Sequence, residues 1–501
     1  MTTFRDVIDA HALSSPAAPF LIAPETRSTI TYGDLARNAQ RLSACLRAGG
    51  AKPGDVVSFM LGNGAAAATI LLGTMYSGCV VSPINLLTQD AHLDHVLAHA
   101  APRIVFAAPE FIGRIEAALV RVLRRPRIIA VDPDAVEFGA GEDATPPPLA
   151  ASAPAMLMYT SGTTGLPKGV LLSHANMIHA GRAVAQAHAL GRDDRVLSSL
   201  PLYHINGQCI GTVSPLVSGG SIVMPHRFSV SQWWTLVETY RPTWVNLVPT
   251  IAAYLLNGPA LTSAQRTACE GVRFARSASA PLPPEQHRAF EARFGIGILE
   301  ALGLTECASV AFANPLDAAL RKIGSCGMPL GVEARVVAPD GAVLADLARG
   351  EIEVRGENVM AGYHHAPEET ARAFHDGWLR TGDLGHRDAD GFYFVTGRLK
   401  ELIIKGGENI APREIDEALL RHPAVLEGAA VGVPDAHYGQ EILACVVVKP
   451  GASLGEDELR EHCERELGRY KTPKYLRFVD ELPKGPSGKV QRLRLAETVA
   501  R

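Results

Sequence analysis

Short apolar runs alternate with longer segments of helical apolar spacing along the first half of the chain, and this alternation narrows the fold more than any other feature. Runs such as Val56–Met60, Ile104–Ala107 and Thr243–Leu247 have the length and aliphatic content of buried strands. Between them, stretches such as His174–Leu190 repeat apolar residues at helical spacing. Strands that alternate with helices favour an α/β fold with largely parallel sheets. At 501 residues the chain exceeds one ordinary core, so at least two lobes are expected.

The pattern changes near Arg398, where a charged segment follows Gly397. Roughly the last 100 residues read as strand, helix, two strands and helix, which suits a small α+β domain of ordinary size. We therefore predict a large N-terminal domain of packed α/β sheets over residues 1–397 and a small mobile α+β domain over residues 398–501. Lys400, in the charged connector, is the predicted hinge.

The longest uncharged stretch, residues 56–89, does not predict a membrane span. A Gly-Asn-Gly sequence interrupts it, and the continuous part, Ala65–Tyr76, is about twelve residues long, against the roughly 20 that a spanning helix needs. We expect a buried helix there, followed by a buried strand at residues 79–82. The N-terminus lacks the apolar core of a signal peptide, and the eight cysteines form no Cys-x-x-Cys pair, so a cytoplasmic protein is expected.

The composition narrows the class of partner. A formal net charge of −4 gives no reason to expect nucleic acid or an anionic membrane surface. Small molecules are therefore the expected partners, and the sequence leaves a homodimer open.

One loop points to phosphate chemistry. Residues 159–169 read Tyr-Thr-Ser-Gly-Thr-Thr-Gly-Leu-Pro-Lys-Gly, directly after an apolar strand. Glycines let backbone N–H groups approach phosphate oxygens, hydroxyls add donors, and lysine adds positive charge. The Gly-Lys-Ser/Thr ending of a P-loop is absent, and a flexible surface loop is the alternative. The predicted nucleotide-binding residues of this loop are Thr160, Ser161, Gly162, Thr163, Thr164, Gly165 and Lys168.

Further motifs follow the loop in a fixed order. They are Pro201-Leu202-Tyr203-His204, Ser277–Leu282, Ala301–Glu306, Thr381-Gly382-Asp383, Gly397-Arg398, Gly406-Gly407 and Pro483–Lys489. Together they resemble the adenylate-forming superfamily of acyl-CoA synthetases, peptide-synthetase adenylation domains and luciferases, from Tyr32 to Lys489. The resemblance implies an ATP-dependent enzyme that activates a carboxylic acid as an acyl-adenylate and passes the acyl group to a thiol, with coenzyme A as the favoured acceptor.

The resemblance also assigns site residues. On the nucleotide side it implies that Ser279, Ala280, Pro281 and Leu302 lie at adenine, Asp383 at ribose, Arg398 at ribose or phosphate, Thr305 near the α-phosphate, and Glu306 on Mg²⁺. It further implies that Lys489 is the adenylation lysine, that His204 lies beside the acid, and that Gly406 and Gly407 line the pantetheine arm of coenzyme A. Leu302 departs from the family pattern, because an aromatic residue normally stacks near adenine there.

Two of these roles have a direct physical basis. A magnesium ion that bridges phosphates needs an oxygen ligand such as Glu306 and keeps several of its waters. The ammonium group of Lys489 would neutralise charge as the carboxylate attacks and pyrophosphate departs.

Three polar residues bear on which acid is used. Asn206 lies two residues after His204, Asn246 precedes Val248-Pro249-Thr250, and Arg276 lies in a stretch that is usually apolar in relatives. An arginine that reaches the pocket would pair with a second anionic group on the acid. This favours a small polar or dianionic acid such as sulfoacetate, malonate or oxalate. The alternative is that Asn246 and Arg276 only satisfy buried backbone groups.

Other functions remain open from the sequence. A stand-alone adenylation enzyme that loads a carrier protein, a medium-chain or aromatic acyl-CoA ligase, and a luciferase-like oxygenase would share the same motifs. A non-catalytic nucleotide sensor is more remote, because it would not need Lys489.

Overall fold

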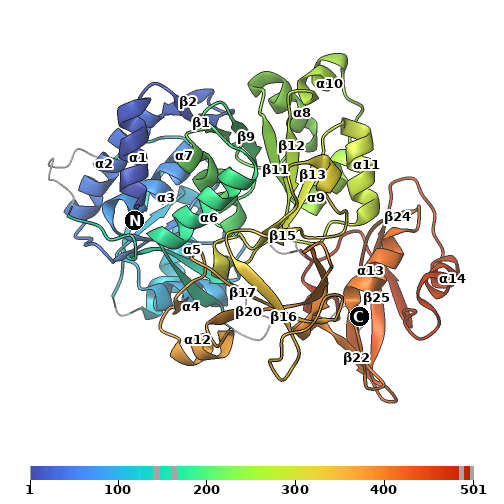
Figure 1. Ribbon diagram of the computed structural model, residues 1–501. Helices are drawn as coiled ribbons and strands as arrows, with labels where there is room; N and C mark the ends of the chain where they lie inside the picture. Colours follow the sequence, from blue (N-terminus) through green and yellow to red (C-terminus); the bar gives the residue numbers. More distant parts are fainter. Residues whose placement is uncertain (1, 123, 139–146, 161–165, 485–489, 497–501) are drawn as a thin grey trace.

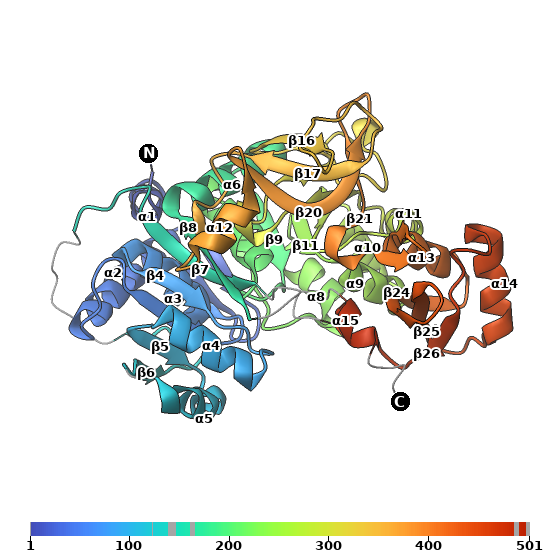
Figure 2. The same cartoon turned by 90° about the horizontal axis from the view of Figure 1, so that it is seen from below.

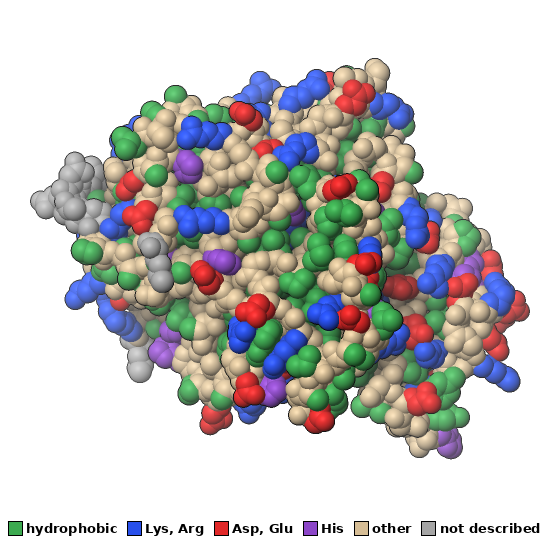
Figure 3. Space-filling model, viewed as in Figure 1, with side chains coloured by type: hydrophobic (Ala, Val, Ile, Leu, Met, Phe, Trp, Pro, Cys, Tyr) green, Lys and Arg blue, Asp and Glu red, His purple; other side chains and the backbone are tan. Residues whose placement is uncertain are grey.

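The structure is a computed structural model that describes residues 2–122, 124–138, 147–160, 166–484 and 490–496. Figures 1 and 2 show a large body formed by the first four fifths or so of the chain, with the small C-terminal domain at one side. In the space-filling view, basic and acidic side chains are interspersed over the visible face (Figure 3). The α/β fold with a large N-terminal and a small C-terminal domain is confirmed.

The first large sheet carries the loops that form the site. Its strands among the described residues are, in spatial order, β15 (Met328–Pro329), β14 (Phe312–Ala313), β13 (Ile298–Leu302), β12 (Phe274–Ser277), β11 (Trp244–Leu247), β9 (Arg195–Ser198), β10 (Ser221–Val223), β1 (Pro19–Ala23) and β2 (Ser28–Thr31). The strands from β13 to β1 are parallel, as the alternation with helices predicts.

The second large sheet carries the two strands that flank the predicted phosphate loop. Its described strands are β18 (Gly362–Tyr363), β8 (Lys168–Ser173), β7 (Pro154–Thr160), β4 (Val80–Pro83), β3 (Val56–Met60), β5 (Ile104–Ala107) and β6 (Arg127–Ala130). Helix α3 (Ala65–Ser77) is buried at every position, and one hydrophobic core joins it to residues of both sheets. The uncharged stretch is thus a buried helix followed by a strand, as predicted, with the strand one residue later. No described helix is long and apolar enough to cross a bilayer.

The remaining helices surround the sheets. They are α1 (Phe4–Ser14), α2 (Tyr32–Ala48), α4 (Asp90–Ala100), α5 (Pro109–Ala118), α6 (His174–Ala187), α7 (Ser214–Ser218), α8 (Val230–Tyr240), α9 (Pro249–Leu256), α10 (Ser263–Cys269) and α11 (Pro284–Phe294). Helix α6 begins where predicted. A capping box fixes this end, because Ser173 Oγ accepts from the Asn176 backbone N–H and Asn176 Oδ1 accepts from the Ser173 backbone N–H. It ends earlier than predicted, and Ala189 then adopts a left-handed backbone (φ 46°).

The strands before and after residue 398 belong to two different sheets. Strands β16 (Glu333–Val337), β17 (Gly350–Arg355), β19 (Phe374–His375), β20 (Trp378–Arg387) and β21 (Tyr393–Arg398) form a sheet on the large body, with α12 (Pro367–Ala373) beside it. Strands β22 (Ile403–Lys405), β23 (Glu408–Ile410), β24 (Val425–Asp435), β25 (Gly439–Val448) and β26 (Tyr475–Phe478) form another, with helices α13 (Pro412–Leu420), α14 (Glu456–Leu467) and α15 (Arg492–Leu495). The second group has its own hydrophobic core. The boundary at residue 398 stays a prediction.

Candidate active site

A small cavity lies at the carboxyl ends of three adjacent parallel strands, β9, β11 and β12. In open α/β sheets this edge is where ligands bind. The cavity has a volume of about 190 Å³. Its lining residues are Ser199, Leu200, Pro201, His204, Phe228, Val248, Thr250, Ile251, Tyr254 and Ser279. The predicted acid-side His204 and adenine-side Ser279 thus share one cavity.

The wall residues His204 and Ser279 are held in distinct ways. Burial lowers the pKa of His204 to about 4, so its imidazole is neutral near pH 7. Its Nδ1 accepts a hydrogen bond from the Asn206 backbone N–H at 3.3 Å. Ser279 has a left-handed backbone (φ 75°), and its Oγ accepts from Asn206 Nδ2 at 3.1 Å. Asn206 therefore holds two of the lining residues, His204 and Ser279, in place.

Behind this wall, a row of polar side chains crosses the sheet. Strand register pairs Ser198 with Asn246 and Asn246 with Arg276, so the three side chains lie side by side on one face. Asn246 Nδ2 donates to Asn206 Oδ1 at 3.1 Å and to Ser198 Oγ at 3.4 Å. The π-helical segment η2 (Asn206–Val213) packs on the row, since a Cβ on Gly211 would approach Ser198 Oγ to 2.8 Å. None of the three residues lines the cavity itself, but Asn206 links the row to it.

Arg276 is the unusual member of this row. Its side chain is fully buried, and Nε, Nη1 and Nη2 have no hydrogen-bond partner among the described residues. Burial lowers its pKa to about 10. Asn246 Oδ1 and Ser277 Oγ are also unpaired there. Neither Asn246 nor Arg276 donates to a described backbone carbonyl. The alternative that these two residues only satisfy buried backbone groups is therefore supported by no hydrogen bond among the described residues.

Two of the predicted phosphate-binding residues lie on the antiparallel strand pair β7–β8. Thr160 and Lys168 face each other across the pair, at the base of the loop. Lys168 Nζ contacts the carboxylate of Glu369 on α12 and lies 5.2 Å from the ring centre of Tyr363. Tyr363 Oη donates to Glu306 Oε1 at 2.9 Å. The predicted phosphate lysine and the predicted metal carboxylate are therefore joined through one tyrosine.

Thr305 and Glu306 form a single 3₁₀ turn directly after β13, so they leave the same sheet edge as the cavity. The backbone oxygen of Glu306 accepts from the Met360 N–H at 2.8 Å. Leu302 is half-buried and packs on the main core, and its predicted place at adenine stays a prediction. Ala280 and Pro281 follow Ser279 at the end of β12.

The two residues predicted to hold ribose form an ion pair across two strands. Asp383 on β20 faces Arg398 on β21, and Arg398 Nε donates to Asp383 Oδ1 at 2.6 Å. The Asp383 carboxylate raises the pKa of Arg398, so the guanidinium stays charged. Asp383 itself is almost fully buried. The pair presents one acceptor and one donor group, as ribose hydroxyls require.

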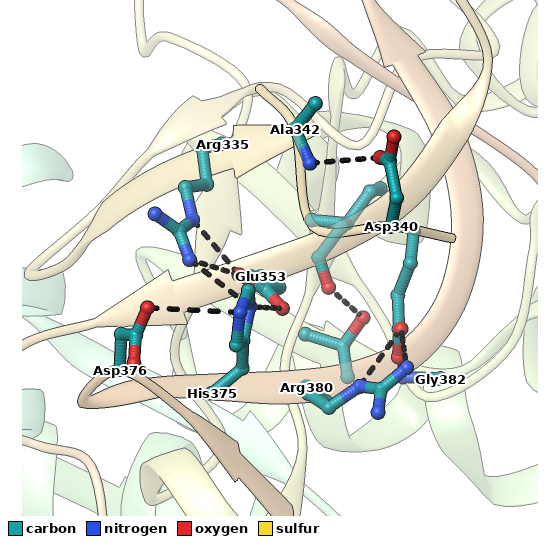
Figure 4. Close-up of polar contacts among 11 residues, drawn as sticks. Arg335, Asp340, Ala342, Glu353, His375, Asp376, Arg380 and Gly382 are labelled. Carbon is teal, nitrogen blue, oxygen red and sulfur yellow. Dashed lines mark hydrogen bonds and ion pairs between the residues drawn. The ribbon is translucent and has the colours of Figure 1, made fainter. Parts of the chain in front are cut away.

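A network of polar contacts on β17 and β20 holds the segment that precedes Asp383 (Figure 4). Glu351 accepts from the Gly382 N–H at 3.2 Å and from Arg380 at 2.8 Å. Next to it, buried Glu353 binds Arg335 at 2.6 Å and His375 at 3.2 Å. Strand β20 is thereby fixed just before Asp383.

The small domain carries the remaining predicted residues. Gly406 and Gly407 form the two-residue turn between β22 and β23, both with positive φ (56° and 87°), which explains why both are glycine. Lys400 lies exposed in a 3₁₀ turn after β21. Ser161, Gly162, Thr163, Thr164, Gly165 and Lys489 lie outside the described residues.

Sequence reasoning missed Tyr363, Glu369 and Glu351. The sequence signal for the first two is a Gly-Tyr pair followed by Pro-Glu-Glu within residues 362–369. This signal points to no function by itself, because Tyr363 and Glu369 come close to Lys168 only when β18 pairs with β8. Glu351 had no signal, because its partner Gly382 is 31 residues away.

Comparison with known proteins agrees with this geometry. Residues 8–364 match the family model described as AMP-binding enzyme, and residues 414–489 match that described as AMP-binding enzyme C-terminal domain. The chain belongs to the AMP-binding enzyme family. Sulfoacetate–CoA ligase of Cupriavidus necator is 55% identical over 98% of this chain and 97% of its own length. Oxalate–CoA ligase of Arabidopsis thaliana is 33% identical over 89% of each chain.

Solved structures agree with the family at the level of the fold. ATP-bound MatB from Rhodopseudomonas palustris has a TM-score of 0.89 and 32% identity, covering 99% of both chains. The prediction of an AMP-forming acid–CoA ligase that uses ATP and coenzyme A is confirmed. The individual roles of the ligase residues remain proposals.

Proposed function

We propose that this ligase joins a small dianionic acid of the sulfoacetate class to coenzyme A. The observation that carries the proposal is the fully buried Arg276, whose guanidinium nitrogens have no partner among the described residues. A buried charge is ordinarily paired, because leaving it unpaired is costly. A sulfonate or second carboxylate on the acid would supply the missing acceptors, with charge-assisted hydrogen bonds. Sulfoacetate is the acid named in the 55% identical relative, which supports the same class here.

The size of the cavity supports a small acid. Pockets for drug-sized ligands measure roughly 300–1,000 Å³, whereas this cavity measures about 190 Å³. Its apolar lining by Phe228 and Tyr254, by contrast, favours a second candidate, an aromatic acid. In our proposal the carboxylate of the acid lies beside His204. The second anionic group displaces the Asn206 side chain, which separates the cavity from the polar row, and so reaches Arg276 and Asn246.

In the first half-reaction, a carboxylate oxygen of the acid attacks the α-phosphorus of ATP and pyrophosphate leaves. We assign the departing phosphates to Thr163, Thr164 and Lys168, the ribose to Asp383 and Arg398, and the α-phosphate to Thr305 and Lys489. These groups act by positioning and charge stabilisation.

We assign the Mg²⁺ that accompanies ATP to Glu306. The carboxylate fits, since Mg²⁺ usually takes one or two carboxylates together with substrate phosphates. No group of three or more described His, Cys, Asp or Glu side chains could hold a metal by itself, in keeping with a metal that arrives with the nucleotide. The bound ion would supply charge neutralisation on the phosphates.

In the second half-reaction, the small domain rotates about Lys400, which withdraws Lys489 and brings Gly406 and Gly407 to the thiol. The coenzyme A sulfur then attacks the acyl carbonyl, the bond to AMP breaks, and a thioester forms. Hinge residues of this kind absorb the change in backbone angles. We place the reaction in the cytoplasm, because scattered cysteines with no Cys-x-x-Cys pair suit a reducing compartment.

AMP release with ATP, Mg²⁺ and coenzyme A tests the proposal, across sulfoacetate, malonate, oxalate, acetate, benzoate and octanoate. We expect sulfoacetate to give the highest kcat/KM and acetate, which lacks a second anionic group, to be poor. Preference for benzoate or octanoate would contradict the acid class and leave the ligase chemistry intact. Activation by ATP with transfer only to a carrier protein would replace coenzyme A as acceptor. Binding of ATP without turnover of any acid would favour a sensor.

A further inference from the structure

Lys168, the predicted phosphate lysine, is occupied by a carboxylate of its own chain. Its Nζ contacts Glu369 Oε2, although the two residues are 201 positions apart. Both side chains are about one-third exposed (32% each), so the pair lies at a solvent-accessible surface. Hydrogen bonding to Lys168 lowers the pKa of Glu369, which keeps the carboxylate ionised.

The contact is imposed by the fold. Strand β18 pairs with β8, with Tyr363 opposite Val170, and the His364 N–H donates to Gly169 O at 2.7 Å. Thr370 Oγ1 accepts from the Tyr363 N–H at 2.9 Å, which ties α12 to the same strand. Glu369 is therefore presented directly to the residue that ends the phosphate loop.

Tyr363 marks the side of Lys168 on which phosphates would lie. The ring is 5.2 Å from Lys168 Nζ, and its hydroxyl donates to Glu306, our assigned magnesium ligand. Lys168 thus contacts a fixed carboxylate, Glu369, and is linked through Tyr363 to Glu306, where we assign the metal that accompanies the phosphates. A carboxylate and a phosphate are alternative acceptors for the same ammonium donors.

We propose that Glu369 competes with pyrophosphate for Lys168, holding the lysine when the phosphates are absent and reclaiming it as pyrophosphate leaves. The inference rests on the use of ATP and not on which acid is bound. In this role Glu369 is a positioning residue. It weakens the retention of pyrophosphate and so favours release after the first half-reaction.

The test is product inhibition by pyrophosphate in Glu369→Gln, with ATP as the varied substrate and any acid that the enzyme turns over. Exposed ion pairs have small free energies, so the inhibition constant of pyrophosphate should fall about two- to fivefold. The KM for ATP should fall with it. Glu368→Gln is the matched control, since it removes the same charge from the same helix and Glu368 has no contact with Lys168 among the described residues.

Two further variants separate Lys168 from other causes. In a Lys168→Met background, the Glu369→Gln change should lose its effect on pyrophosphate. Glu369 also pairs with Arg372, and Arg372→Gln/Glu369→Gln should keep the tighter inhibition if Lys168 is responsible. Thermal unfolding of each variant verifies that it is folded.

The proposal is overturned if Glu369→Gln and Glu368→Gln shift the inhibition constant equally, because only bulk charge then matters. It is also overturned if pyrophosphate binds more weakly to Glu369→Gln, which would mean that Glu369 holds Lys168 in its productive position. Retention of the full effect without Lys168 would reject it as well. None of these outcomes depends on sulfoacetate being the natural acid.

Discussion

Replacing Arg276 by methionine should stabilise the protein and reduce its activity towards a dianionic acid in the same variant. Burial lowers the pKa of Arg276 from 12.5 to about 10. At about 1.4 kcal/mol per pKa unit, the charged form is disfavoured in the folded state by roughly 3 kcal/mol. Because the folded pKa is below the unfolded one, this penalty is fully present at neutral pH and is relieved only as the pH rises above about 10. Methionine fills similar space without a charge, so the free energy of unfolding should rise by about 1 to 3 kcal/mol.

The activity should move in the opposite direction. A hydrogen bond to a charged group contributes about 1.5–3 kcal/mol, so kcat/KM for sulfoacetate should fall roughly 10- to 150-fold. Turnover of acetate, however slow, should be unchanged, because acetate has no second anionic group to reach Arg276. Sulfoacetate at a concentration that just saturates the wild type should raise the melting temperature of the wild type more than that of the variant.

Urea unfolding of the unliganded protein and AMP release give the two readouts. Arg273→Met is the control, since Arg273 lies on the same segment but is one-third exposed (34%) and pairs with Asp194. It should lose stability slightly and keep its acid preference. The reasoning fails if Arg276→Met is destabilised and retains the wild-type ratio of kcat/KM between sulfoacetate and acetate. Arg276 would then serve the fold alone.

Three further predictions concern other parts of the ligase. Lys489→Ala should abolish ATP–pyrophosphate exchange and leave thioester formation from a supplied acyl-adenylate intact; equal loss of both would contradict the division of roles. Gly407→Ala should cost about 1 kcal/mol in backbone strain and slow only the thioester half-reaction, measured with acyl-adenylate and coenzyme A. The control Gly391→Ala, at a turn with similar φ (85°), should leave that rate unchanged. Burial raises the pKa of Glu300 from 4.5 to about 7, so its protonated form stabilises the fold below about pH 4.5 and this contribution is lost as the pH rises through 7. Above pH 7 the free energy of unfolding of Glu300→Gln should therefore exceed that of the wild type by about 3 kcal/mol at most, which raises its urea midpoint. Equal urea midpoints for the two proteins at all pH values would refute the raised pKa as the cause.

Much of the fold could be predicted from the sequence, because the patterns that indicate strands and helices are local. The apolar runs at Val56–Met60 and Ile104–Ala107 became strands with those bounds, since short aliphatic runs between turns suit a buried parallel strand. The uncharged stretch around α3 was a buried helix, as its length required. Boundaries moved where a backbone conformation outside the pattern intervened, as at the end of α6.

The candidate site divides in the same way. The sequence by itself determined the residue types and the order of the motifs, and therefore the family, the α/β class and the chemistry of ATP-dependent acid activation. Only the tertiary structure decided which of these residues meet. Strand register places Arg276 beside Asn246, and the β18–β8 pairing places Glu369 on Lys168. Neither contact can be derived from spacing, because it depends on which strands become neighbours and on what the packing leaves unpaired in the core.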